Sequence, residues 1–158
     1  MRTYGEITNE PFPSGVHLND VSLVSPVWHE GEILGYVANL AHHVDVGGGA
    51  PASIGAFREV FQEGVIIPPI RLVEHGELVE DVFRLLLSQI RSKRETAGDF
   101  RAQIAANVTG GRRLQDVAAR YGHETLRAAM AELLEYTERR ARAELAALPH
   151  GVYEAEGQ

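Results

Sequence analysis

The stretch LGYVANLAHHVDVGGG, residues 34–49, decides the fold of the first half of the chain. Residues 34–40 are mostly apolar and include β-branched and aromatic side chains, so they predict a strand. The glycines at 47–49 predict a loop, because a residue without a Cβ atom accepts positive φ and lets the backbone approach a bound group. His42, His43 and Asp45 stand between the two. The predicted strand therefore ends in side chains that are able to ligate a metal.

Two further strands are predicted outward from this segment, at residues 21–24 and 64–72, where β-branched residues are again enriched. Glu30-Gly31 predicts a hairpin turn between Pro26-Val27-Trp28 and the strand at 34–40, since glycine favours the left-handed backbone of tight hairpin turns. The first 75 residues are thus expected to be rich in β-structure.

After Gly76 the pattern changes to apolar residues spaced three and four positions apart, which is typical of amphipathic helices. We expect one helix at about 78–92. A second helix is expected to begin near Asp99, to be interrupted at Gly110-Gly111 and to continue to Tyr121. A last helix is expected at about 124–148, with its leucines facing inward, among them Leu133, Leu134 and Leu145.

These elements predict an α+β fold, in which a β-rich part at residues 1–75 is followed by three to four helices at 76–150. The whole chain, residues 1–158, is interpreted as a single partial domain. A fragment, a split gene product and a decayed copy of a longer protein are all open as its origin.

Composition limits the class of function. The 158-residue chain has a formal net charge of −7 and no long block of Lys or Arg, which argues against a nucleic acid partner. It has no cysteine, so any metal site must use nitrogen and oxygen ligands. No apolar run approaches the roughly 18–20 residues of a membrane span, and the N-terminus lacks the apolar core of a signal peptide. A cytoplasmic location without membrane contact is therefore expected.

The best candidate for chemistry is a set of His and Asp residues in two short segments, His17-Leu18-Asn19-Asp20 and Ala41-His42-His43-Val44-Asp45. Imidazole and carboxylate ligands together suit Mn, Fe or Zn. Adjacent His42 and His43 on a strand point to opposite faces, so at most one of them is expected to be a ligand. From the residues alone, a cluster that only stabilises the loops by hydrogen bonds is an equal alternative.

Other motifs are weaker. Gly47-Gly48-Gly49 lacks the Lys-Ser/Thr of a phosphate-binding loop, and the chain has no Gly-x-Ser-x-Gly elbow, so neither nucleotide binding nor a serine hydrolase is supported. Asp99 and Gln103 share one face of a predicted helix at i and i+4. Either these two residues cap the helix and form pairs on its surface, or one of them faces a pocket.

Several longer runs closely resemble the hydantoinase B/oxoprolinase family, which includes the α-type subunits of acetone carboxylase. Two departures from the family pattern are Asn-Glu-Pro-Phe in place of Asn-Asp-Pro-Tyr, and Gly-Val-His-Leu in place of Gly-Thr-His-Leu. They change the groups beside the expected ligands. The matching runs, in chain order, are 9–12, 15–21, 35–48, 61–69 and 98–106.

This resemblance implies a divalent metal, manganese in the first place, with zinc or iron as alternatives, held by His17, Asp20 and His42. His43 and Asp45 would then support the ligands by hydrogen bonds. The resemblance assigns no catalytic residue beyond the metal ligands. The further residues that it places in or near the pocket are Asn9, Asn39, Gly47, Gly48, Asp99 and Gln103.

The resemblance also implies an activity. It is ATP-dependent opening of a cyclic amide such as a hydantoin or 5-oxoproline, or the related carboxylation of a ketone. ATP would be used by a partner, a hydantoinase A-like subunit, and the chain is expected to form an oligomer. The alternative from another class is a non-catalytic assembly module whose His/Asp cluster is structural.

Overall fold

A computed structural model describes residues 4–11 and 17–156 of the chain. Phe12, Gly15 and Val16, which belong to the runs that resemble the family, lie outside the described residues. The chain divides into two compact units, residues 1–116 and 117–158. The first unit contains the sheet, a short helix within the β3–β4 connection, one helix that follows the sheet and most of the next, long helix.

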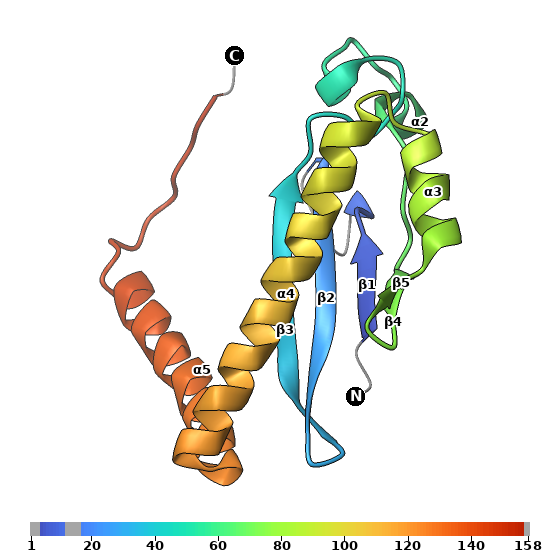
Figure 1. Cartoon of the computed structure of the whole chain (residues 1–158). Helices are drawn as coiled ribbons and strands as arrows, with labels where there is room; N and C mark the ends of the chain where they lie inside the picture. The colour runs from blue at the N-terminus through green and yellow to red at the C-terminus, as the bar shows by residue number, and fades with distance from the viewer. Residues whose placement is uncertain (1–3, 12–16, 157–158) are drawn as a thin grey trace. The chain divides into compact units, whose positions relative to one another are not determined.

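The first unit is built on an antiparallel five-stranded sheet with the strand order β3-β2-β1-β4-β5 (Figure 1). The strands are β1 Tyr4–Thr8, β2 Asp20–His29, β3 Glu32–His42, β4 Ile70–Glu74 and β5 Glu77–Leu78.

The predicted turn at Glu30-Gly31 is confirmed, because both residues have positive φ and they join β2 directly to β3. Pro26 lies inside β2, at a position where only β3 pairs with that strand. Proline is tolerated there because its missing N–H removes no bond to a second neighbour.

Helices follow the sheet in the order expected from the sequence, which confirms the α+β class. A 3-10 turn at Pro51–Ser53 and the short α2 at Val60–Glu63 lie in the connection from β3 to β4. The longer helices are α3 Glu80–Ser88, α4 Lys93–Tyr121 and α5 His123–Ala146. Among the described residues, none of these helices combines the length and the apolar character needed to cross a membrane.

The prediction of an interrupted helix is wrong, since α4 continues from Lys93 through Gly110-Gly111 to Tyr121. Two glycines in a helix cost about 1 kcal/mol each relative to alanine, so something must compensate. A Cβ atom on Gly110 would lie 3.2 Å from Cγ1 of Val37 on β3. The glycines therefore allow α4 to pack closely on the sheet.

The strand boundaries also differ from the prediction. The expected strand at 64–72 is a strand only from Ile70, because Pro68 and Pro69 have no N–H to give to a ladder. The segment before the prolines still makes single backbone bonds, Val65 N–H to Val46 O at 2.8 Å and Asn9 N–H to Ile67 O at 3.2 Å.

The hydrophobic core lies between the sheet and the helices α3 and α4. Phe100 of α4 and Phe83 of α3 meet edge to face, with ring centroids 6.2 Å apart. Side chains of β1 and β2 complete the core, and among them Ile7 and Val21 are fully buried. The core residues are Ile7, Leu18, Val21, Leu23, Val46, Ile67, Leu72, Phe83, Leu86, Ile90, Ala97 and Phe100.

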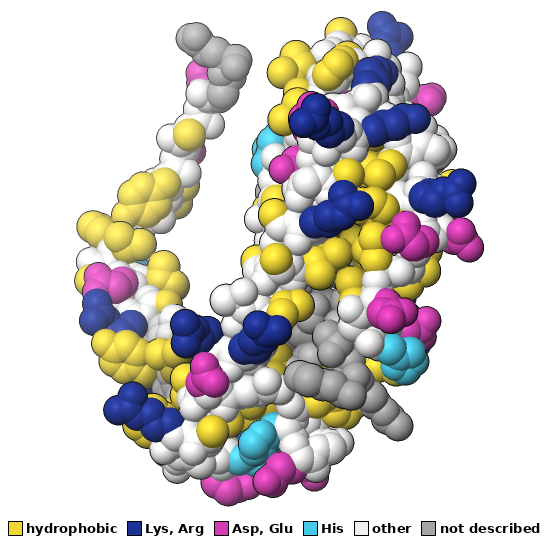
Figure 2. All heavy atoms as spheres, viewed as in Figure 1, with side chains coloured by type: hydrophobic (Ala, Val, Ile, Leu, Met, Phe, Trp, Pro, Cys, Tyr) yellow, Lys and Arg dark blue, Asp and Glu magenta, His cyan; other side chains and the backbone are white. Residues whose placement is uncertain are grey.

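In the second unit, α5 begins after Gly122, whose φ of 86° suits only glycine at low cost. Figure 2 shows basic, acidic and hydrophobic side chains interspersed over this helix. Leu133, Leu134 and Leu145 are exposed, which corrects the prediction that they face inward. Helical periodicity identifies the apolar side chains of a helix, but it does not supply the surface that would cover them.

Candidate metal centre

The structure brings together the three residues expected to ligate a metal. Asp20 is the first residue of β2 and His42 is the last residue of β3, and the strand register pairs them directly. His17 stands three residues before Asp20 in a tight turn closed by a bond from Asp20 N–H to His17 O, 3.0 Å. The β2–β3 pairing and this turn therefore fix the arrangement.

Asp20 is at the centre of the cluster. Its Oδ1 lies 2.7 Å from Nδ1 of His42, and its Oδ2 lies 3.4 Å from Nδ1 of His17. The same Oδ2 accepts a hydrogen bond from the His17 backbone N–H at 3.0 Å. The two imidazole rings meet edge to face, with centroids 5.6 Å apart.

The donor set fits a divalent first-row metal. One ligand atom from each of His17, Asp20 and His42 lies within 4.8 Å of the others. Two imidazole nitrogens and one carboxylate oxygen suit Mn, Fe or Zn, and three protein ligands leave positions for substrate or water. The His17 and His42 side chains are 67% and 56% exposed, whereas that of Asp20 is only 13% exposed. Access to the cluster is therefore from the histidine side.

Buried Asn19 holds the two strand ends together beside the cluster. Its side-chain amide donates to His43 O at 2.6 Å, and its backbone carbonyl oxygen accepts from His43 N–H at 2.9 Å. Ser53 Oγ lies 2.7 Å from both Asn19 Oδ1 and Glu63 O, and so ties the 3-10 turn to the same point. No pattern in the sequence indicated this positioning role of Ser53.

His43 and Asp45, which were expected to support the ligands, make their described hydrogen bonds to other groups. His43 is buried and its ring lies against Phe100, with centroids 4.9 Å apart. Its Nε2 lies 3.0 Å from Gln103 Oε1. Because the Gln103 amide nitrogen already donates to Val21 O and Asn39 Oδ1, we assign the proton of this bond to His43 Nε2. His43 thus anchors the end of β3 to α4.

Asp45 is buried and fastens the glycine loop to the connection between α3 and α4. It accepts bonds from Gly47 N–H at 2.9 Å, from Arg91 N–H at 2.7 Å and from the Arg91 guanidinium at 3.1 Å. Burial alone would raise the pKa of Asp45. The backbone N–H donors of Arg91 and Gly47, together with the Arg91 charge, outweigh burial and hold this pKa below its ordinary value.

Arg91 also donates to the carbonyl oxygens of Gly47, at 3.3 Å, and Gly48. This guanidinium closes the glycine loop, a role that was not predicted from the sequence. Its partner Asp45 is 46 residues away, so no local pattern could have linked the two.

The remaining pocket candidates do not gather around the cluster. Asn9 is buried and binds Leu18 O, Val65 O and Ile67 N–H, so it joins three segments of backbone. Asn39 bonds to Gln103 and Asn107 on the sheet-facing side of α4. Asp99 is exposed on the first half of α4.

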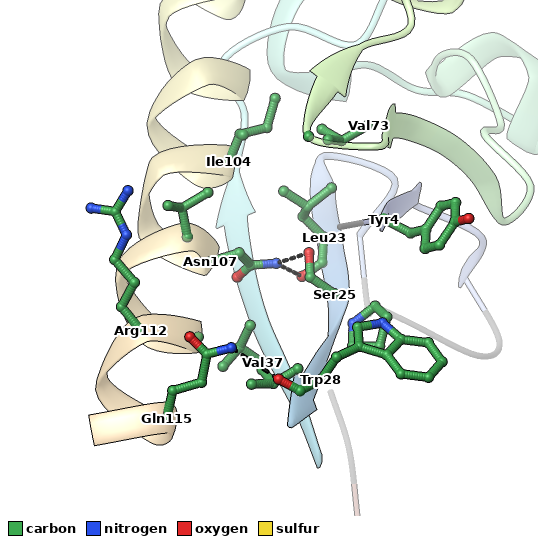
Figure 3. A pocket seen from close by; sticks show the side chains of 15 residues that line it. Tyr4, Leu23, Ser25, Trp28, Val37, Val73, Ile104, Asn107, Arg112 and Gln115 are labelled. Atoms are coloured by element: carbon green, nitrogen blue, oxygen red, sulfur yellow. Dashed lines mark hydrogen bonds between the residues drawn. The ribbon is translucent and has the colours of Figure 1, made fainter. Parts of the chain in front are cut away.

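A separate cavity of about 260 Å³ lies between α4 and the sheet, away from the His/Asp cluster (Figure 3). Its walls are mostly apolar and include Leu23, Val37, Val73 and Ile104. Asn107 crosses it to reach Leu23 O and Ser25 Oγ, each at 3.0 Å. None of the three candidate ligands lines this cavity.

Comparison with known proteins gives a consistent result. The family model described as hydantoinase B/oxoprolinase matches residues 6–158. The chain is 36% identical over 146 residues to the beta subunit of caprolactamase from Pseudomonas jessenii, covering 92% of this chain and 25% of that protein. It is 34% identical over 151 residues to the B-type subunit of a putative D-/L-hydantoinase from a Pseudomonas species, covering 94% and 26%. The chain therefore spans about a quarter of the length of these relatives.

Two solved structures share the fold. The crystal structure of the ATP-dependent caprolactamase from Pseudomonas jessenii matches with a TM-score of 0.87 and 34% identity, over 94% of this chain and 26% of that chain. Nucleotide-free acetone carboxylase matches with a TM-score of 0.73, over 77% of this chain and 16% of that chain. At 24% identity, the second match shows the fold alone.

Proposed function

The chain belongs to the hydantoinase B/oxoprolinase family, and from this premise we propose that it supplies the metal-binding part of an ATP-dependent enzyme that opens cyclic amides. The related carboxylation of a ketone is the second reaction of this type that the same site suits. The observation that carries the proposal is the convergence of His17, Asp20 and His42 from two separate segments onto one point.

The roles of the residues follow from their geometry. Asp20 lies between the two histidines and orients both imidazoles, because its two oxygens face their Nδ1 atoms. The largely buried carboxylate is held in place by its backbone position at the start of β2. A divalent ion bound by these three side chains, with manganese preferred over zinc or iron, would polarise the carbonyl oxygen of an amide or ketone.

We propose that this chain works together with other subunits. The chain spans about a quarter of the relatives' length, and two of these relatives are by name subunits, one of a caprolactamase and one of a putative hydantoinase. We therefore propose that ATP is used by a partner, a hydantoinase A-like subunit, and that the assembly is an oligomer in the cytoplasm. The apolar side chains exposed on α5 are in keeping with contacts to other chains.

The same exposed side chains also favour the second candidate function, a non-catalytic assembly module in which the His/Asp cluster is structural. The two candidates differ in one property that is simple to measure. Only the first requires the chain to bind a divalent metal at the cluster.

The test is a metal-binding titration of the purified chain, with Mn²⁺ followed by its electron paramagnetic resonance signal and bound metal counted by elemental mass spectrometry. Wild type is expected to bind about one ion per chain. The double variant His17→Ala, His42→Ala is expected to bind at least about a hundredfold more weakly, since two of three ligands are lost.

The matched control is the double variant His75→Ala, His150→Ala, which removes the same number of imidazoles from exposed positions outside the cluster. It should bind the metal like wild type. If wild type binds none of Mn, Fe and Zn, or if the cluster variant binds as tightly as the control, the proposal is refuted and the assembly module is favoured.

A further inference from the structure

The His/Asp cluster stands at the end of one face of the sheet. Side chains alternate between faces along a strand, and directly paired residues share a face. The pairs Asp20–His42, Ser22–Leu40 and Val24–Ala38 therefore all lie on the same face. We call this surface, made by these six residues, the metal face.

Helix α4 covers the opposite face of the sheet. Gln103 and Asn107 on α4 donate to Val21 O and Leu23 O, and the Val21 and Leu23 side chains are buried there. In Figure 1, α4 runs along β2 and β3 on this covered side. The metal face is thus left as the accessible surface on which a molecule held at the cluster would rest.

Leu40 is the first apolar side chain on the metal face next to the ligands. It is two residues from His42 on the same strand, a distance of about 7 Å. It is 53% exposed, although most leucines of the sheet are buried. A leucine in this position offers apolar surface to the part of a substrate that extends from the metal-binding atoms.

Positive charge is absent from the metal face near the cluster. Its residues other than Asp20 and His42 are Ser22, Leu40, Val24 and Ala38, which carry no charge. Arg71 of β4 is separated from the metal face by Glu6 of β1, because Glu6 pairs with Val24 on one side and with Arg71 on the other. Arg71 is displaced from Asp20 by four residues along the strand direction and by two strands across the sheet. These displacements correspond to about 13 Å along the strands and about 10 Å across them. The Arg71 guanidinium is bound to Glu74 at 2.8 Å.

We propose that Leu40 and its strand partner Ser22 form the part of the substrate surface next to the metal ligands, and that this surface selects an uncharged lactam ring. The hydrocarbon part of the ring lies on Leu40. When its carbonyl occupies the metal, a cyclic amide that carries a carboxylate places that charge on the apolar surface of Leu40, where none of the six residues of the metal face offers a cationic side chain beyond the ligands themselves. Burying the charge there is unfavourable. This inference rests on the proposed function, because it places the substrate carbonyl at the cluster.

The test uses the full chain loaded with Mn²⁺ and two probes, ε-caprolactam and 5-oxoproline. The paramagnetic ion shortens the proton relaxation times of a molecule bound beside it, so binding is measured without turnover. Relaxation that remains with the double variant His17→Ala, His42→Ala is subtracted for each probe. Wild type is expected to bind caprolactam more tightly than 5-oxoproline.

Two substitutions at one position then examine the apolar contact. Leu40→Ala should weaken caprolactam binding about five- to tenfold, the range expected for losing most of one leucine contact. Leu40→Arg should reverse the preference, because it supplies a cation for the carboxylate of 5-oxoproline. The matched control is Leu85→Ala on α3, since Leu85 is 60% exposed but lies outside the metal face. It should bind both probes like wild type.

The possible outcomes separate this inference from the proposed function. If the chain binds none of Mn²⁺, Fe²⁺ and Zn²⁺, both fall together. If Mn²⁺ binds but the two probes relax equally, or neither relaxes, the choice of an uncharged ring is overturned and the metal site stands. Equal caprolactam binding by Leu40→Ala and Leu85→Ala, with circular dichroism showing both folded, overturns the role of Leu40 alone.

Discussion

Replacement of Gly48 by alanine should destabilise the first unit strongly, for a reason that a second glycine makes measurable. Gly48 has a φ of +74°, and an added Cβ atom would lie 2.5 Å from Gln62 O and 2.6 Å from Gly64 N. Both neighbours are backbone atoms, so no side-chain rotation relieves the contact. Gly31 has a φ of +92°, but its added Cβ atom would have no neighbour within 4 Å.

The two substitutions share the conformational cost and differ in the steric one. A left-handed conformation costs an alanine about 1–2 kcal/mol, and the loss of glycine's freedom in the unfolded chain returns about 0.4–1 kcal/mol. Gly31→Ala should therefore cost about 1 kcal/mol. Gly48→Ala must also displace the backbone at 62–64, and overpacking of this kind adds about 1–3 kcal/mol. We expect about 3 kcal/mol in total.

The assay is urea unfolding followed by the fluorescence of Trp28, the single tryptophan of the chain, which reports on the first unit. With a slope of about 1–3 kcal/mol per molar urea, the difference of about 2 kcal/mol between the variants corresponds to a midpoint difference of about 1 M. Equal midpoints for Gly48→Ala and Gly31→Ala would show that the loop at 46–49 does not press against the backbone at 62–64.

Two further predictions concern the contact of Asp45 with Arg91. Arg91→Ala should lower the free energy of unfolding by about 1–2 kcal/mol. This is less than the loss of one partner of a fully buried ion pair would cost, because the Arg91 side chain is half exposed and two backbone donors to Asp45 remain. An unchanged urea midpoint would contradict this prediction. The folded-state pKa of Asp45 lies below its ordinary 3.8, so its contribution to stability is complete above about pH 4 and is lost as the pH falls through the lowered value. Between pH 6 and pH 3 the wild type should therefore lose more stability than Asp45→Asn, and parallel losses would count against the bond network.

Where local chemistry decides the backbone, the sequence was a sufficient guide. Glu30-Gly31 forms the predicted hairpin turn because Gly31 accepts positive φ at low cost, which allows the chain to reverse there with Glu30 also at positive φ. The apolar spacing at 78–92 likewise predicts α3, since Phe83 and Leu86 are the side chains that it buries. The order of strands first and helices second follows from such local signals.

Structure that depends on distant partners was missed. Strand β1 was not predicted, because its five residues have little pattern of their own. It is nevertheless central in the sheet, since Ile7 pairs with Leu23 on one side and Ile70 on the other. The continuity of α4 through Gly110-Gly111 likewise depends on the surface of β3 that packs against it.

The candidate site also combines features that local sequence indicates with features that depend on distant contacts. The types of residue, imidazole and carboxylate, were visible in the sequence, but their convergence depends on the pairing of Asp20 with His42 across 22 residues. The supporting groups were assigned less well. His43 and Asp45 lie next to the ligands in sequence, yet their described side-chain bonds go to Gln103, Gly47 and Arg91. A strand reverses side-chain direction at each residue, so neighbours in sequence serve opposite faces.

The pairing of Asp20 with His42 also has a consequence for the order in which the protein folds. Both residues belong to one hairpin, and His17 precedes it by a single turn, so the three donors meet through sequence-local contacts. A hairpin closes within about 1–10 μs, whereas contacts of long sequence separation form later because their loop-closure entropy is larger. The donors can thus converge on a ribosome-bound chain as soon as residue 42 has emerged. The cluster can therefore assemble before α4 has been synthesised.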